Sequence, residues 1–133
     1  MEIKIKVPGV PVGKQRPRVT MHGTYTPQKT ADYESLVRWC WRAQSGECFC
    51  SNVALKATMR FYMPIPQSLS DRKRKAFEGQ AHVKRGDLDN FVKAVCDALN
   101  KIAYADDAQI SCIDAVKLYS AEPRAEIEIT DRW

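Results

Sequence analysis

Acidic side chains gather in one part of the chain, between residues 87 and 107. Asp87 and Asp89 stand two positions apart at the start of an expected helix, and Asp106 and Asp107 follow shortly after its end. In an extended approach to a helix, side chains two residues apart point to the same side, so the first two carboxylates can face one point. Such acids repel each other unless a cation neutralises them. Oxygen ligands without histidine or cysteine favour Mg²⁺ or Mn²⁺ over zinc.

Lys93 completes a set of residues suited to phosphodiester hydrolysis. It lies four residues after Asp89, one helical turn away on the same face. A bound divalent cation supplies a nucleophilic water and stabilises the leaving oxygen of a phosphodiester. A lysine beside it can orient that water or neutralise the pentavalent phosphorane.

Two simpler explanations apply to some of these acids. An aspartate at a helix start is often only a cap that favours the helix dipole, although Asp87 and Asp89 cannot both be the cap. Asp97 is expected to be a solvated acid or to pair with Lys93 or Lys101. For Asp106 or Asp107 to lie beside the first two carboxylates, the strand that follows must pair close to residues 87–89. The spacing leaves open whether this happens, and it leaves open which of the two aspartates would join the group.

Basic residues flank the acids in two blocks, residues 14–29 and 72–85. No acid lies between Lys4 and Asp32, and the chain carries a formal net charge of +5. Excess positive charge attracts phosphates, while a metal ion makes an acidic centre tolerable to them. This layout is typical of a metal-dependent nuclease.

Length and composition limit the other possibilities. The 133 residues amount to one domain, and a hydrophobic content of 44% is ordinary for a globular protein. The chain has no apolar run of membrane-spanning length, so we expect no membrane partner. It has no secretory signal, and its five cysteines are an odd number, so we expect reduced thiols in the cytoplasm. Cys48 and Cys50 lack zinc-site spacing. The glycines before Lys14 lack phosphate-loop spacing, which argues against a nucleotide cofactor.

Hydrophobic periodicity predicts four main strands and three helices. The strands are expected at residues 2–7, 53–61, 110–118 and 125–129; the helices are expected from a Thr30 cap to residue 43, over 71–78, and from about 90 to 101. A small hairpin is expected between residues 18–20 and 25–27. The order β-α-β-α-α-β-β predicts a single α+β domain, residues 1–133, with a small mixed sheet packed with helices. In this arrangement a strand-helix-strand unit lies beside a C-terminal hairpin.

The acidic stretch resembles the signature of a known nuclease family. Asp87-Leu88-Asp89-Asn90-Phe91-x-Lys93-Ala94-x-x-Asp97-Ala98-Leu99-Asn100, followed by Ala105-Asp106-Asp107-Ala108-Gln109-Ile110, closely resembles that of the RusA family of Holliday junction resolvases. These are small, often prophage-encoded endodeoxyribonucleases. Gly13-Lys14-x-Arg16-Pro17-Arg18 and Tyr25-Thr26-Pro27 resemble, more loosely, the basic N-terminal loop of its bacterial and phage branch.

The resemblance implies a homodimer that binds a four-way DNA junction in recombination and repair and nicks two strands symmetrically with Mg²⁺, for which Mn²⁺ is a possible substitute. By position, the metal-binding catalytic aspartates would be Asp87, Asp89 and Asp107, with Asp106 an auxiliary acid and Lys93 the catalytic lysine. The basic blocks supply the expected DNA-binding residues, which are Lys14, Arg16, Arg18, Lys84 and Arg85. The alternative is a branched-DNA or RNA binding protein without catalysis, which the basic residues support equally well but which leaves the grouped acids unexplained.

Overall fold

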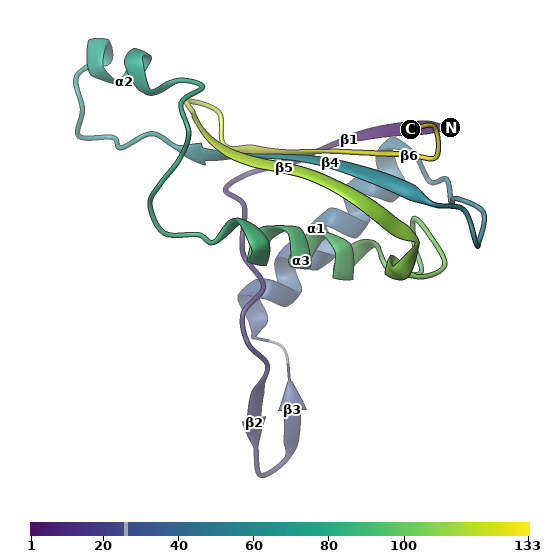
Figure 1. Cartoon of the computed structure of the whole chain (residues 1–133). Helices are drawn as coiled ribbons and strands as arrows, with labels where there is room; N and C mark the ends of the chain where they lie inside the picture. The colour runs from purple at the N-terminus through teal and green to yellow at the C-terminus, as the bar shows by residue number, and fades with distance from the viewer. Residues whose placement is uncertain (26) are drawn as a thin grey trace.

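A four-stranded mixed sheet forms the centre of the molecule (Figure 1). The computed structural model describes residues 1–25 and 27–133. The sheet order is β1-β6-β4-β5, with bounds β1 Glu2–Pro8, β4 Leu55–Pro64, β5 Ile110–Ser120 and β6 Arg124–Thr130. β4 runs parallel to β5 and antiparallel to β6, and β6 is antiparallel to β1. The predicted α+β class and element order are confirmed.

The predicted C-terminal hairpin is wrong, because β4 lies between β5 and β6 in the sheet. Tyr62 of β4 has Leu118 as its neighbour on one side and Arg124 on the other, so the short connection after β5 crosses the end of β4. The physical reason lies in β4 itself. Its alternate residues from Leu55 to Met63 are buried, and a central position covers such a strand better than an edge does.

Two helices, α1 (Gln28–Gln44) and α3 (Leu88–Leu99), cover one face of this sheet (Figure 1). The core between the layers is built from the inward side chains of the strands and from residues such as Trp41, Phe91 and Leu99, all of which are buried. Phe61 and Phe91 pack with ring centroids 5.2 Å apart. This packing ties the start of α3 to the middle of β4.

The start of α1 differs from the expected Thr30 cap. The helix begins at Gln28, with Pro27 in the capping position and no side-chain cap bond. Thr30 is fully buried and lies in the first turn of the helix. Its hydroxyl accepts a hydrogen bond from the backbone N–H of Gln15 and donates one to the carbonyl of Gly13. The cap prediction is wrong because this threonine bonds to the preceding loop instead of to its own helix.

Two small elements complete the fold. β2 (Arg18–Thr20) and β3 (Gly23–Tyr25) form a hairpin that projects away from the sheet and helices (Figure 1). A hairpin is present as predicted, but its second strand is Gly23–Tyr25 instead of residues 25–27, because Pro27 already caps α1; Thr26 lies outside the described residues. The short helix α2 (Asp71–Phe77) is present as predicted, and Ser70 is its N-cap. None of the described helices combines the length and hydropathy that a membrane span requires.

Candidate active site on α3 and the following 3-10 turn

Asp87 occupies the N-cap position of α3. Its backbone is extended, and its carbonyl accepts hydrogen bonds from the N–H groups of Asn90 and Phe91 at 3.0 and 3.2 Å. Its exposed carboxylate makes no capping hydrogen bond. An aspartate that served only as a cap would accept a bond from the first turn. The carboxylate of Asp87 is therefore free for another ligand.

Asp89 lies in the first turn of α3, not in an extended approach to it. The helix begins at Leu88, so the expectation that Asp87 and Asp89 face one point as alternate residues of an extended segment is wrong. The reason is that the Asp87 carbonyl accepts the first hydrogen bonds of the helix, so the helix already begins at Leu88. Asp89 is exposed, and its carboxylate stands at the positive end of the helix dipole.

The loop before Asp87 is held by a lysine of the neighbouring strand. The ammonium of Lys117, on β5, donates hydrogen bonds to the carbonyls of Lys84 and Gly86 at 2.8 and 2.6 Å. Gly86 has a φ of +107°, and a Cβ there would meet the ring of Phe91 at 2.6 Å. Only glycine fits this position, and the loop enters α3 along one defined path.

Asp106 has a structural partner in the 3-10 turn η1 (Asp107–Gln109). Its carboxylate accepts a 2.9 Å hydrogen bond from the N–H of Ala108, and its own N–H donates to the side-chain carbonyl of Gln109. That capping bond lowers the pKa of the Asp106 carboxyl. The amide nitrogen of Gln109 donates to the carbonyls of Cys50 and Val53, which joins this turn to the loop before β4.

Asp107 lies closer to the other charged groups of α3. Its N–H donates to the side-chain oxygen of Asn100 at 3.1 Å, which fixes the turn against the end of the helix. Partial burial raises the pKa of the Asp107 carboxyl, and its hydrogen bond with Asp106 and the charges of Asp106 and Asp97 raise it further. The ammonium of Lys93 acts in the opposite direction. The geometry thus distinguishes two acids that the spacing left equivalent.

Asp97 pairs with Lys14, not with the helix lysines that the sequence suggested. The ammonium of Lys14 lies 3.2 Å from Asp97 and 2.6 Å from Glu34 of α1. Burial alone would lower the pKa of Lys14, but its hydrogen bonds to the two carboxylates outweigh that effect and raise it. Sequence reasoning missed Glu34. Its available signal was an acid placed among the buried positions Tyr33 and Val37 of α1.

The donor chemistry of the acids suits a hard divalent cation, since it consists of carboxylate oxygens alone. A raised pKa at a carboxyl with acidic neighbours also marks a place where a cation would relieve repulsion. Within residues 1–25 and 27–133, however, no three acid, histidine or cysteine side chains form a group able to hold a metal ion. Asp87, Asp89 and Asp107 are therefore not gathered into a formed metal site.

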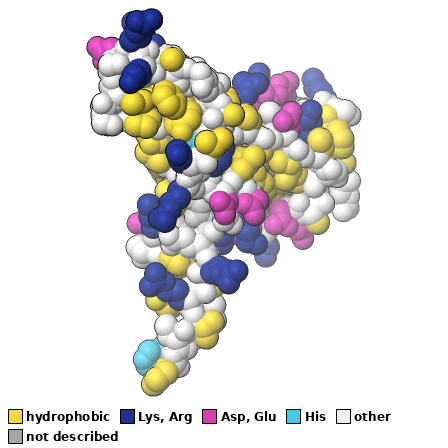
Figure 2. All heavy atoms as spheres, turned by 60° about the vertical axis from the view of Figure 1, so that its left-hand side comes forward, with side chains coloured by type: hydrophobic (Ala, Val, Ile, Leu, Met, Phe, Trp, Pro, Cys, Tyr) yellow, Lys and Arg dark blue, Asp and Glu magenta, His cyan; other side chains and the backbone are white. Residues whose placement is uncertain are grey.

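Exposed basic side chains lie on both sides of the acids. Arg16 and Arg18 are exposed near the hairpin, and Lys84 and Arg85 are exposed in the loop before α3. Figure 2 shows acidic side chains in the middle of one face, with basic ones toward the hairpin and toward the opposite end.

The three tryptophans differ in exposure. Trp41 is buried, while the side chains of Trp39 and Trp133 are exposed.

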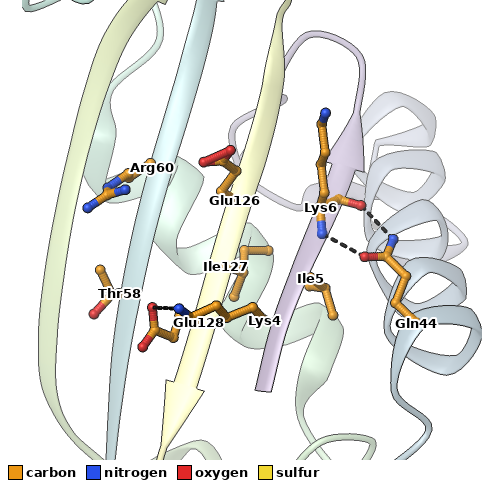
Figure 3. Close-up of a pocket in the computed structure, with 9 residues that line it drawn as sticks. All are labelled: Lys4, Ile5, Lys6, Gln44, Thr58, Arg60, Glu126, Ile127 and Glu128. Carbon is orange, nitrogen blue, oxygen red and sulfur yellow. Dashed lines mark hydrogen bonds and ion pairs between the residues drawn. The ribbon is translucent and has the colours of Figure 1, made fainter. Parts of the chain in front are cut away.

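A separate hollow of about 330 Å³ lies on strands β1, β6 and β4 (Figure 3). Lys4 of β1 lies 3.9 Å from Glu128 of β6, and Arg60 and Glu126 also line the hollow. Gln44 of α1 bonds both backbone groups of Lys6 on the edge strand. The lining carries the cations Lys4, Lys6 and Arg60 and the carboxylates Glu126 and Glu128, so the hollow is of mixed charge.

Carboxylates with a lysine on the same helix, on an α+β domain with exposed basic loops, are the arrangement expected of an enzyme that cuts nucleic acid. The family model of endodeoxyribonuclease RusA matches residues 8–130, and the chain belongs to that family. It is 31% identical to the uncharacterized protein YqaN of Bacillus subtilis (strain 168), over 97% of this chain and 96% of that protein. It is 35% identical to the crossover junction endodeoxyribonuclease rusA of Lactococcus phage r1t, over 80% of this chain and 76% of that protein. The suspected family is thereby confirmed, and with it the endodeoxyribonuclease activity.

Proposed function

We propose that residues 1–133 form a single RusA-like endonuclease domain that resolves four-way DNA junctions in the cytoplasm during recombination and repair. The observation that carries the proposal is the arrangement of charge along α3: Lys93 lies on the helix between Asp87 and Asp89 at its start and Asp107 against its end, and exposed basic side chains lie in the loop before it. The family and the printed name of the phage relative support a crossover junction as the substrate.

We assign the catalytic roles as follows. Asp87, Asp89 and Asp107, which are not gathered into a formed site in this structure, would have to come together to hold Mg²⁺ or, in its place, Mn²⁺, which when bound would supply an activated water and charge neutralisation at the phosphate. Lys93 orients the attacking water or neutralises the developing phosphorane. Asp106 is an auxiliary acid, because one of its oxygens already caps η1.

The basic loops would bind phosphates of the junction arms. Arg16, Arg18, Lys84 and Arg85 are exposed, so their charges are available for this role. Lys14 belongs to the same proposed set, but its ammonium is already held by two carboxylates. We therefore expect its contribution to DNA binding to be indirect, through the position of its loop.

The catalytic proposal is tested by Asp107→Asn, with Asp114→Asn as the matched control. Asp114 is an exposed acid of β5 outside the acidic group. Asp107→Asn should slow cleavage of a synthetic junction at least about 100-fold. Loss of a residue that only supports a metal ligand already costs up to about 100-fold, and loss of a ligand itself should cost no less. Its affinity for the junction should stay within about twofold, because no phosphate contact is removed. Cleavage by Asp107→Asn at the wild-type rate would exclude the assignment.

Paired symmetric nicks would require two sites, and we propose that a homodimer supplies them. Light scattering at micromolar concentration should give twice the chain mass, and a monomer mass would count against paired cutting. The alternative function, a branched-DNA or RNA binding protein without catalysis, rests on the same basic loops. It predicts junction binding with no cleavage whether or not Mg²⁺ is added.

A further inference from the structure

The β2–β3 hairpin carries hydrophobic side chains where none is needed for folding. Met21 in its turn is 98% exposed, Val19 is 80% exposed and Tyr25 is 48% exposed. Figure 1 shows the hairpin extending away from the sheet and both main helices, and hydrophobic side chains reach its far end in Figure 2. Single exposed apolar residues are ordinary. Three of them on one short projecting ribbon suggest a surface that becomes covered on binding.

The charge of this segment indicates the kind of partner. Arg16, Arg18 and Lys29 surround the hairpin, and no acid lies between Lys4 and Asp32. In the described part of the chain, none of these three cationic groups has a carboxylate within 4.0 Å. A basic stem with an apolar tip is complementary to nucleic acid, whose phosphates lie outside and whose base faces are apolar.

The hairpin is fixed at its base to the candidate active site. The N–H of Lys14 donates to the carbonyl of Asn90 on α3 at 2.9 Å, and the Lys14 ammonium joins α1 to α3 through Glu34 and Asp97. The N–H of Gln15 donates to the hydroxyl of Thr30 on α1. These contacts hold the stem against the helix that begins at the acids. From Arg18 to Met21 a strand advances about 10 Å, so the tip would reach DNA bound at the site.

We propose that Met21, supported by Val19, inserts between bases at the branch point of the junction. This inference rests on the proposed function and adds the element that recognises the branch. Methionine is among the apolar side chains that proteins insert between base steps. Insertion costs least where stacking is already interrupted, as it is at a branch point. The hairpin therefore favours a branched junction over a continuous duplex.

The experiment uses the full chain and a four-way junction with 2-aminopurine at the branch point, without divalent metal so that the strands stay uncut. Wild type should raise the 2-aminopurine fluorescence as the base unstacks. Met21→Gln keeps the length of the side chain and removes its apolar character. It should abolish the fluorescence rise and weaken junction binding about tenfold, equivalent to about 1.4 kcal/mol. Met21→Leu should retain both properties, and Val10→Ala, at a 49% exposed valine outside the hairpin, should match wild type.

The outcomes separate the two proposals. If wild type cuts the junction with Mg²⁺ and Met21→Gln binds and unstacks it equally well, the insertion is refuted and the proposed function stands. If wild type neither binds nor cuts the junction, the proposed function fails. A change in mass by light scattering for Met21→Gln without DNA would mean that the hairpin contacts a second copy of the chain, which also overturns insertion into DNA.

Discussion

Replacing Lys14 with methionine should strongly destabilise the domain. The Lys14 side chain is 14% exposed, and its ammonium lies between the carboxylates of Glu34, 12% exposed, and Asp97, 32% exposed. Lys14→Met keeps an unbranched apolar stem but removes the charge. It leaves the buried carboxylate of Glu34 and the partly exposed carboxylate of Asp97 without their cation, so the cost comes from the unpaired carboxylates more than from the lost lysine.

The magnitude follows from these exposures. Breaking a buried ion pair by removing one partner costs about 3–5 kcal/mol, whereas an exposed pair is worth about 0–1 kcal/mol. The contact with Glu34 is close to the buried limit, and the contact with Asp97 is nearer the exposed one. We therefore expect a loss of about 3 kcal/mol. For a chain of this length, that corresponds to a fall in Tm of about 10 °C.

Urea unfolding and thermal melting measure this loss directly. Glu34→Gln in the Lys14→Met background should recover about 1 kcal/mol or more, because it removes one unpaired charge. The raised pKa of Lys14 keeps it charged at neutral pH. The stabilisation is thus complete below the unfolded value of about 10.4 and is lost as the pH rises through the folded value. A Tm within about 2 °C of wild type, or strictly additive single and double mutants, would refute the reasoning.

The same variant separates an internal role of Lys14 from a phosphate contact. Salt dependence is measured as the slope of the logarithm of the binding constant against the logarithm of the salt concentration. Removal of a residue that binds a phosphate reduces the size of this slope by about one. We expect this change for Arg16→Met, whose exposed side chain has no carboxylate partner in residues 1–25 and 27–133, and not for Lys14→Met. An equal change in both would show that Lys14 binds DNA directly.

Three further predictions concern the packing around α3. Gly86→Ala should lose about 3 kcal/mol in urea unfolding, because it combines a φ of +107° with a Cβ 2.6 Å from the Phe91 ring; a loss below about 1 kcal/mol would contradict this. Tyr104→Phe should lose about 1 kcal/mol, because its buried hydroxyl donates to the Cys96 carbonyl at 2.9 Å, and unchanged stability would argue against that bond. Burial and nearby acids raise the pKa of the Cys96 thiol to about 11, so at pH 8 iodoacetamide should modify exposed Cys48 first. Peptide mass mapping would show the order, and faster labelling of Cys96 would contradict the raised pKa of its thiol.

Much of the fold could be predicted because the local signals agree with each other. The alternation in β1 and β4 and the apolar stripe from Phe91 to Leu99 each specify one conformation, and the structure contains all of them. The errors occurred where a residue has two possible partners. Thr30 bonds to an earlier loop instead of to its own helix, and the strands at the C-terminus are separated by β4.

The candidate site shows the same division. The acids and Lys93 were identified from residue type and spacing, and their catalytic roles stay a prediction. The partner of Asp97 was not, because Lys14 lies more than eighty residues away in the chain and meets it only when the N-terminal loop packs on α3. Likewise, nothing local shows that Lys117 holds the loop before Asp87.

The sequence by itself determined the types and spacing of the acids, the two basic blocks and the order of the helices and strands. Those properties depend on short-range periodicity and on residue chemistry, which need no knowledge of the rest of the chain. Only the tertiary structure decided that Asp106 caps a turn while Asp107 faces the charges of α3, that Lys14 is neutralised, and that Met21 is left exposed. These outcomes depend on which distant groups become neighbours, and a carboxylate or an ammonium takes its role from the charges and solvent around it.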